Sequence, residues 1–283
     1  MTTELDQALR AATSRLGAAG IEEPYREARI LLGAAIGADQ AGLLRRRGGD
    51  LTTEEAGRFD DMVARRAQRI SAAHVIGHRE FWSLDFRVTE DTLVPRPDSE
   101  LVIETALELR PARDAVRSIL DLGTGSGCLL LAALSEYRSA WGLGIDLSPK
   151  TAAVAQGNAA ALGLASRAAI AVGRWTEALA GRFDLLLCNP PYIPAADIAD
   201  LMPEVGLHEP RLALDGGADG LDPYRLLFAD LPQRLTPAGL ALFEFGIGQA
   251  EALQALAGAA GLAVVALRAD LGGHPRVLAV SHR

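Results

Sequence analysis

Short apolar runs alternate with helical segments over the second half of the chain, and this alternation limits the fold more than any other feature. Runs this short and this apolar are typical of strands that are buried on both faces of a parallel sheet. Strands that alternate with helices and short turns predict an α/β fold with a doubly wound parallel sheet. The predicted strands lie near Ser118–Leu122, Trp141–Asp146, Ala168–Val172, Phe183–Cys188, Leu240–Phe245, Leu262–Leu267 and Val277–Ser281.

The first predicted strand leads directly into a glycine-rich turn that is followed by an apolar helix. Glycines let the backbone turn tightly and approach a ligand, and the start of a helix offers unpaired N–H groups. The next strand ends in Asp146, where an acidic side chain can accept hydrogen bonds from ribose hydroxyls. The pattern predicts an adenosine site made of Gly123, Thr124, Gly125, Ser126, Gly127 and Asp146.

The spacing of the glycines narrows the choice of cofactor. The turn reads Gly-x-Gly-x-Gly, whereas a dinucleotide fingerprint is Gly-x-Gly-x-x-Gly and a P-loop needs Gly-Lys-Ser or Gly-Lys-Thr. Taken alone, the turn leaves a nicotinamide site and an ordinary strand-to-helix connection as alternatives.

A second motif, Asn189-Pro190-Pro191-Tyr192, follows the fourth predicted strand. The Asn189 side chain and the Pro190 backbone each offer a carbonyl oxygen, and two such acceptors suit a planar NH2 group. Holding both hydrogens would aim a poorly nucleophilic nitrogen at an electrophile, and Tyr192 could cover the group with its ring. The alternative is a loop of two prolines packed beside a core strand.

The two motifs are expected to meet, because the first and fourth strands of such sheets are neighbours. An adenosine beside an electrophile that faces an amine clamp suggests S-adenosylmethionine. Trp175, shortly after the third strand, could stack on the adenine or could be a half-buried tryptophan in a loop.

The region before this sheet has a different character. Apolar residues at helical spacing predict a bundle of short helices over residues 1–72, in which Thr52 or Thr53 with Glu55 could cap one helix. Residues 73–97 are aromatic-rich and alternating, which predicts a β-hairpin and linker. Ser99 could cap the first helix of the remaining domain, residues 98–283.

Composition excludes some classes of function. The chain has 283 residues, 49% of them hydrophobic and 23% charged, with a net charge of −8. An acidic chain disfavours binding to nucleic acid through its phosphates. No apolar stretch reaches membrane-spanning length, Met1–Arg10 does not resemble a signal peptide, and Cys128 and Cys188 lack metal-ligand spacing. We therefore expect a cytoplasmic protein with no metal and no membrane partner.

Together these residues resemble the glutamine-N5 methyltransferases of peptide chain release factors. The resemblance covers nearly the whole chain and rests on several separate stretches. They are His74–Leu84, Val94–Glu100, Asp121–Cys128, Asn189–Tyr192, and Glu209–Pro210 followed by Ala213–Gly217.

The resemblance implies a class I S-adenosylmethionine-dependent methyltransferase domain behind a helical domain that docks the substrate. We expect the chain to act as a monomer. Gly123–Gly127, Asp146, Trp175 and Asn189 would contact S-adenosylmethionine and its product S-adenosylhomocysteine. Asn189–Tyr192 would hold the glutamine of the release factor's Gly-Gly-Gln motif. Relatives commonly have an acid where this chain has Arg174, so the adenine contact of that acid is not implied here.

Other functions fit the same motifs. The clamp also fits the exocyclic amine of a flipped adenine in nucleic acid, and it fits a glutamine in a ribosomal protein. A protein that keeps the fold but only docks the translation machinery is a third alternative. The intact glycines, Asp146 and Asn189 argue against a lapsed site.

Overall fold

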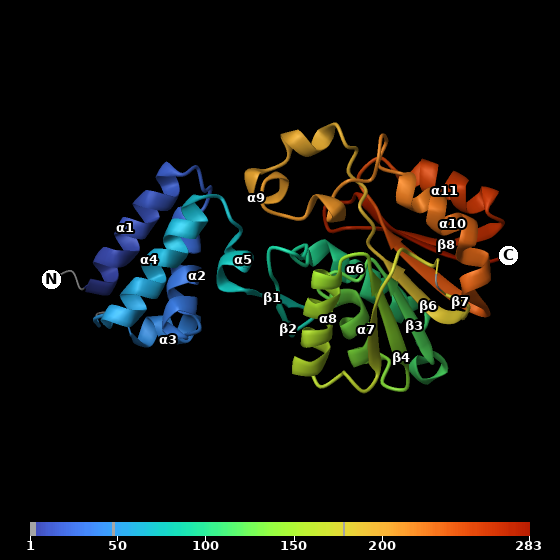
Figure 1. Ribbon diagram of the computed structural model, residues 1–283, viewed down its shortest axis with the longest axis horizontal. Coiled ribbons are helices and arrows are strands. Elements are labelled where there is room, and N and C mark those ends of the chain that lie inside the picture. Colours follow the sequence, from blue (N-terminus) through green and yellow to red (C-terminus); the bar gives the residue numbers. More distant parts are fainter. Residues whose placement is uncertain (1–3, 47–48, 178) are drawn as a thin grey trace. The chain divides into compact units, whose positions relative to one another are not determined.

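The computed structural model describes residues 4–46, 49–177 and 179–283, and it divides into two compact units (Figure 1). The helical unit comprises the described part of residues 1–78 together with Met202–His208. The sheet unit comprises Arg79–Leu201 and Glu209–Arg283. The predicted three-part division at residues 72 and 97 stays a prediction, and its first three residues lie outside the described part of the chain.

The helical unit packs amphipathic helices around a core that includes Leu16, Leu31 and Phe59. Its helix α4 begins with a capping box, since the Thr52 side chain accepts from the Glu55 backbone and the Glu55 side chain accepts from the Thr52 backbone. This confirms the predicted cap at Thr52. The helices are α1 (Glu4–Ala18), α2 (Pro24–Ile36), α3 (Gln40–Arg45), α4 (Thr53–Ala67), α5 (Ala72–Ile76) and α9 (Pro203–Gly206).

An ion-pair cluster holds Met202–His208 in the helical unit, although this segment is distant in sequence. The Glu204 carboxylate lies 2.9 Å from the Arg66 guanidinium and 2.7 Å from that of Arg69. Arg66 also pairs with Glu27 at 2.5 Å, and its side chain is only 6% exposed. Two acidic partners thereby offset the cost of burying one arginine.

The chain then forms a two-stranded hairpin of β1 (His78–Phe81) and β2 (Leu84–Arg87). Its two turn residues, Trp82 and Ser83, have φ values of 54° and 58°. Positive φ at both central residues suits a two-residue hairpin turn, because its twist matches that of the strands. The predicted strands in this region are confirmed.

The sheet unit contains a seven-stranded sheet in the order β5-β4-β3-β6-β7-β9-β8. All seven predicted strands are present, although β7 begins five residues before its predicted start, and β3 and β6 are neighbours, as expected for the first and fourth strands. The strands are β3 (Ser118–Leu122), β4 (Trp141–Asp146), β5 (Ala168–Val172), β6 (Phe183–Cys188), β7 (Leu235–Glu244), β8 (Leu262–Ala269) and β9 (Pro275–His282).

The doubly wound sheet was predicted correctly, but its parallel direction was wrong at one edge. Strand β9 runs antiparallel to both β7 and β8. Only residues 270–274 separate β8 from β9. A parallel crossover needs about a dozen residues or more, so a connection this short forces a hairpin.

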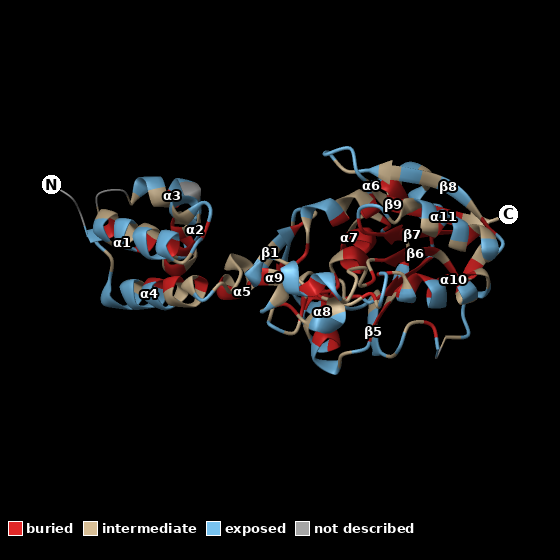
Figure 2. Cartoon of the chain, turned by 90° about the horizontal axis from the view of Figure 1, so that it is seen from above, coloured by how far each residue is buried: buried red, intermediate tan, exposed pale blue. Residues whose placement is uncertain are grey.

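Helices cover both faces of the sheet (Figure 1). Side chains of α6 and α7 pack on one face, against Ile119, Leu185 and Leu187, and side chains of α10 and α11 pack on the other, against Leu120 and Leu186. Figure 2 shows the resulting buried layer along β6 and β7. The α-helices are α6 (Glu100–Leu109), α7 (Cys128–Glu136), α8 (Pro149–Ala161), α10 (Asp222–Arg234) and α11 (Ala250–Ala259), and the 3-10 helices are η1 (Pro97–Ser99), η2 (Arg113–Ala115), η3 (Asp197–Asp200) and η4 (Arg211–Ala213).

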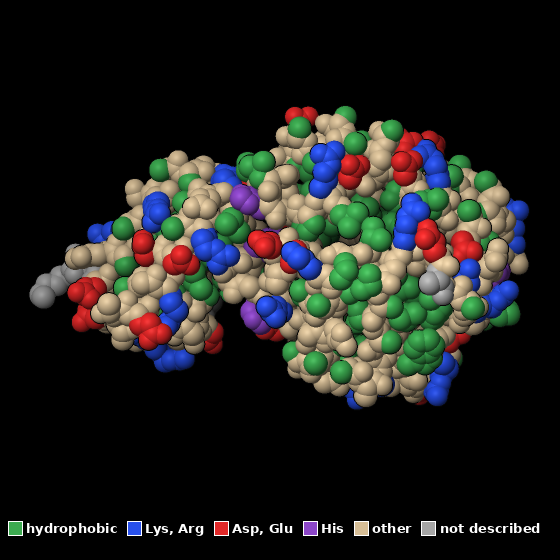
Figure 3. Space-filling view, in the orientation of Figure 1, with side chains coloured by type: hydrophobic (Ala, Val, Ile, Leu, Met, Phe, Trp, Pro, Cys, Tyr) green, Lys and Arg blue, Asp and Glu red, His purple; other side chains and the backbone are tan. Residues whose placement is uncertain are grey.

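On the face of the sheet unit drawn in Figure 3, arginine and lysine side chains are interspersed with aspartate and glutamate. Within the described residues, every helix is too short or too polar to cross a membrane.

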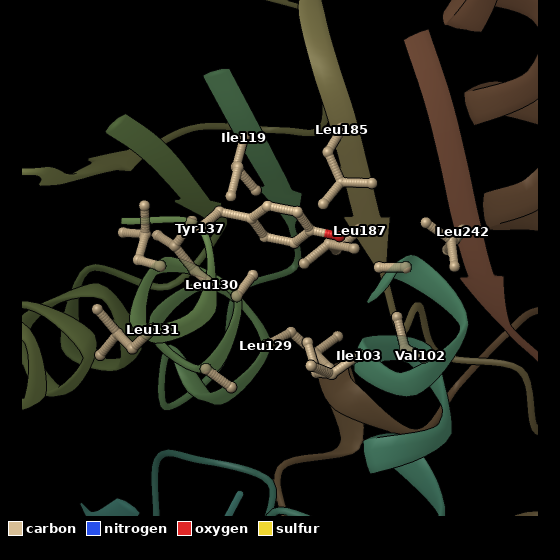
Figure 4. Packing of buried hydrophobic residues seen from close by; sticks show 14 of the residues in the cluster. Val102, Ile103, Ile119, Leu129, Leu130, Leu131, Tyr137, Leu185, Leu187 and Leu242 are labelled. Atoms are coloured by element: carbon tan, nitrogen blue, oxygen red, sulfur yellow. The ribbon is translucent and has the colours of Figure 1, made fainter. Parts of the chain in front are cut away.

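The core beside α7 is closely packed, as Figure 4 shows. The ring of Tyr137 lies among Ile119, Leu185 and Leu187, while Leu129 reaches toward Ile103 of α6. Tyr137 is fully buried. This packing holds α7, which directly follows the glycine turn, against the sheet.

Candidate active site

A cavity of about 750 Å³ opens at the carboxyl ends of β3, β4 and β6. This is the size of a small-molecule site, and it lies where ligands bind in open α/β sheets. The cavity brings most of the predicted site residues together, whereas Gly127, Pro190 and Tyr192 are not part of its lining. Those that line it are Gly123, Thr124, Gly125, Ser126, Asp146, Trp175, Asn189 and Pro191.

The glycine turn has a backbone that other residues adopt only with strain. Gly123, Gly125 and Gly127 have φ values of 71°, 58° and 84°. The N–H groups of Gly123 and Thr124 both donate to the Ile145 carbonyl at 2.9 Å, which ties the turn to β4. Gly127 is the N-cap of α7 and lies outside the cavity lining, and a Cβ added there would lie 3.2 Å from the Leu131 side chain and 3.4 Å from that of Ala155.

Asp146 lies at the end of β4 and is 9% exposed. Its Oδ2 accepts from the Gly125 N–H at 3.0 Å and its Oδ1 from the Ser148 N–H at 2.9 Å. Burial raises the pKa of this carboxyl group, while these backbone donors oppose the rise. Each oxygen keeps a lone pair, so Asp146 can still accept from a ligand in the cavity.

A second buried carboxylate at the turn, Asp121, was missed as a candidate from the sequence. Its Oδ2 accepts from the Thr124 hydroxyl at 2.6 Å, and its Oδ1 is buried without a hydrogen-bond partner among the described residues. Burial raises its pKa to about 7, which the Thr124 hydrogen bond opposes. The available signal was its place directly before Leu122-Gly123, in the stretch that predicted the turn.

Trp175 lies against the glycine turn. Its ring is 3.5 Å from the position that a Cβ at Gly123 would take, and its own φ is 49°. A tryptophan in this left-handed region is a strained residue of the kind that gathers at functional sites. The neighbouring Arg174 is exposed and pairs with Glu177 at 2.9 Å.

Asn189 follows β6 directly, and its side chain lies across from the segment before α6. Its Nδ2 donates to Ser99 Oγ at 3.2 Å, which leaves Oδ1 without a described partner and free to accept. The predicted role of Ser99 as a helix cap was wrong, because its side chain makes no capping hydrogen bond and η1 precedes α6 instead. Ser99 lines the same cavity as Asn189.

Tyr192 lies close to Asn189 in sequence but packs away from the cavity lining. Its hydroxyl is 3.5 Å from Glu244 Oε1, and the Arg276 guanidinium lies 5.8 Å from the centre of its ring. Burial raises its pKa to about 12. One face of the ring therefore already has a cation. Neither Glu244 nor Arg276 has a signal in the sequence, since both come from the distant strands β7 and β9.

The residues present fit S-adenosylmethionine. The glycine turn lets a ligand approach the backbone closely, and Asp146 offers acceptor lone pairs. Trp175 adds an aromatic surface at the same cavity. The fold and the site therefore define a class I S-adenosylmethionine-dependent methyltransferase.

Comparisons with known proteins agree. Residues 99–205 match the family model described as "Methyltransferase small domain", and residues 7–77 match "PrmC N-terminal domain". Among solved structures, a methyltransferase from Pyrococcus furiosus superposes with a TM-score of 0.53 at 15% identity, over 77% of this chain and 97% of the other. The hMettl16 catalytic domain gives 0.58 at 15% identity, over 81% and 82%. At this identity the likeness concerns the fold alone.

Curated relatives are more similar in sequence. The "Release factor glutamine methyltransferase" of Rhodospirillum rubrum is 48% identical over 95% of this chain and 82% of its own length. That of Cereibacter sphaeroides is 47% identical over 96% of this chain and 96% of its own length. That of Bradyrhizobium diazoefficiens is 46% identical over 97% of this chain and 93% of its own length. The chain belongs to the release factor glutamine methyltransferase family.

Proposed function

We propose that this enzyme transfers a methyl group to the side-chain amide nitrogen of the glutamine in the Gly-Gly-Gln motif of peptide chain release factors. One observation carries the proposal. The Asn189 amide gives its NH2 group to Ser99, so its carbonyl oxygen is left to accept from a substrate at the cavity that the glycine turn also lines. Family membership supports the same substrate.

When bound, S-adenosylmethionine supplies a methyl group on a positively charged sulfur. Gly123–Gly127, Asp146 and Trp175 would hold the cofactor, and Asn189 Oδ1 with the Pro190 carbonyl would each accept one amide hydrogen. The clamp would aim the lone pair of the amide nitrogen at that methyl group. Transfer would join the methyl carbon to the nitrogen, leave the sulfur neutral and release one proton from the nitrogen. Orientation of this kind can supply about 7–11 kcal/mol of the barrier.

Glutamate in place of the substrate glutamine tests the clamp. A carboxylate would bring oxygen atoms toward two acceptors and leave both without donors, and sites built on such hydrogen bonds discriminate by about 10⁴ or more. We expect a Gly-Gly-Gln peptide to be methylated and the matched Gly-Gly-Glu peptide to show no measurable turnover. Turnover of both peptides at similar rates would rule the clamp out.

We further propose that the helical unit docks the release factor. These residues form a compact unit with a core of its own, and the cavity is built within the sheet unit, which supports a separate role for the helical unit. Removal of residues 1–72 should preserve S-adenosylmethionine binding and lower activity on intact release factor more than activity on a short Gly-Gly-Gln peptide. Equal losses on both substrates would contradict a docking role.

The proposal places the enzyme in the cytoplasm, as a monomer whose partners do not include nucleic acid. The mixed charges on the face of the sheet unit drawn in Figure 3 support the last point. Light scattering with size-exclusion chromatography would test the monomer. A steep salt dependence of substrate binding would instead favour the adenine methyltransferase.

A further inference from the structure

Glu244 is a buried carboxylate at the edge of the proposed active site whose role the proposed reaction leaves open. It ends β7, and the pairing of Cys188 with Phe243 places it across the sheet from Asn189. It is 1% exposed, and its Oε2 has no hydrogen-bond partner among the described residues. An unpaired buried carboxylate is costly, so its presence at this position calls for a reason.

Ser99 links this carboxylate to the clamp. The Ser99 side chain interacts with the Glu244 carboxyl group and lowers its pKa, and Ser99 Oγ accepts from Asn189 Nδ2 at 3.2 Å. Tyr192 is the other hydroxyl beside Glu244, at 3.5 Å from Oε1. The three side chains Glu244, Ser99 and Asn189 thus form a continuous row that ends at the cavity.

The chemistry of the row determines its direction. An ionised carboxylate only accepts, so the single hydroxyl proton of Ser99 is given to Glu244. Ser99 can then only accept from Asn189, and this selects the NH2 group of the Asn189 amide. The Asn189 carbonyl oxygen is consequently turned toward the substrate.

We propose that Glu244, acting through Ser99, is a positioning residue that fixes the Asn189 amide with its carbonyl oxygen toward the substrate NH2 group. The inference rests on the proposed function and deepens it. A neutral Glu244 can donate to Ser99, which frees the Ser99 proton for Asn189 Oδ1 and turns the Asn189 NH2 group toward the substrate. The NH2 group of Asn189 then faces the NH2 group of the substrate, no hydrogen bond can form between these two donors, and methyl transfer slows.

This chain of hydrogen bonds from Glu244 through Ser99 to Asn189, here called the relay, predicts that the rate of methyl transfer falls at acid pH, which gives the pH–rate profile an acid limb. Burial raises the pKa of Glu244, and the Ser99 hydrogen bond and the Arg276 charge lower it. As the pH falls through this pKa, Glu244 gains a proton and the relay reverses. The titratable and charged groups that face Glu244 are Asp98, Cys128, Cys188, Tyr192, Tyr224 and Arg276.

The test compares the full-length wild type with Ser99→Ala, Glu244→Gln, the double variant and a matched control, using purified release factor as substrate. Thr105→Val is the control, because it also removes one buried hydroxyl, at a site where that hydroxyl donates within α6 to Leu101. Steady-state rates from pH 5.5 to 8.5 and calorimetric S-adenosylmethionine affinities are measured for each.

We expect Ser99→Ala to lower kcat about tenfold at pH 8 while cofactor affinity stays within about twofold. Its acid limb should flatten, since protonation of Glu244 can no longer reach Asn189. Glu244→Gln should lower kcat at least as much at every pH, because its NH2 group donates to Ser99. The double variant should lose about as much as the worse single variant, as residues acting as one unit do.

The relay is overturned if Ser99→Ala keeps the wild-type kcat and acid limb, if Thr105→Val loses as much, or if the two losses simply multiply. If Asn189→Ala is impaired at the same time, the proposed function stands without the relay. No transfer by the wild type to release factor would remove both.

Discussion

The substitution Gly144→Ala in β4 adds a single methyl group and tests how the sheet positions the glycine turn. A Cβ at Gly144 would lie 2.8 Å from Thr124 Oγ1 and 3.0 Å from the Ile170 side chain. Thr124 cannot yield easily, because its hydroxyl donates to Asp121 at 2.6 Å and its backbone N–H to Ile145 at 2.9 Å. Gly144→Ala must therefore break the Thr124–Asp121 hydrogen bond or displace the turn.

The expected loss follows from these contacts. Overpacking costs about 1–3 kcal/mol, and loss of a hydrogen bond to a charged group about 1.5–3 kcal/mol. Partial relaxation of the two together gives about 2 kcal/mol, or roughly 4–8 °C in the melting temperature of a unit this size. Displacement of the turn should also weaken S-adenosylmethionine binding about tenfold.

A matched substitution in the same unit should have the opposite sign. Gly157 is exposed on α8 and lacks a positive φ, and a methyl group added there would have no atom beyond its own stretch of helix within 4 Å. Gly157→Ala should stabilise the protein by about 0.5–1 kcal/mol and leave cofactor affinity unchanged. Calorimetric melting and titration check both variants. Wild-type stability and affinity for Gly144→Ala would refute the assignment of β4 as the support of the turn.

Three further changes have defined outcomes. Asp121→Asn should stabilise the cofactor-free protein at pH 8, because burial raises the folded pKa of Asp121 to about 7 from 3.8 and the charged carboxylate therefore destabilises the wild type at that pH. The gain should fade as the pH falls from 7 to 4, and a difference in melting temperature that does not depend on pH would contradict this. Asn189→Ala should lower kcat by about 10²–10³ with little effect on cofactor affinity, as does the removal of one hydrogen bond to a transition state in other enzymes. Loss of cofactor binding with normal turnover at saturation would show that Asn189 holds the cofactor and not the substrate. Glu204→Gln should cost the helical unit about 2 kcal/mol, because Arg66 and Arg69 lose a charged partner; unchanged urea unfolding would show that the cluster is dispensable.

Features with a local signal were predictable from the sequence. The apolar run Phe183–Cys188 is a strand over those same residues, and the Thr52–Glu55 cap depends on residues three apart. The glycine turn was likewise predictable from the spacing of its glycines. Each of these depends on backbone preferences or neighbours within a few residues, which a single sequence contains.

Features that depend on contacts between distant segments were not predictable in the same way. Ser99 has the residue type of a helix cap, but Asn189 and Glu244 lie opposite it, 90 and 145 positions later in the chain, and they engage its hydroxyl instead. Glu244 itself resembles an ordinary strand-end acid until β7 is placed beside β6. The antiparallel β9 was missed because apolar runs give no direction, and only the short loop before it does.

The central claim is the transfer of a methyl group to one glutamine. Labelled S-adenosylmethionine, the purified full-length enzyme and a release factor are incubated beside a copy of that factor whose Gly-Gly-Gln glutamine is changed to alanine. We expect label on the first factor and none on the second. Equal label on both, or none on either while calorimetry shows the cofactor bound, would contradict the proposed substrate.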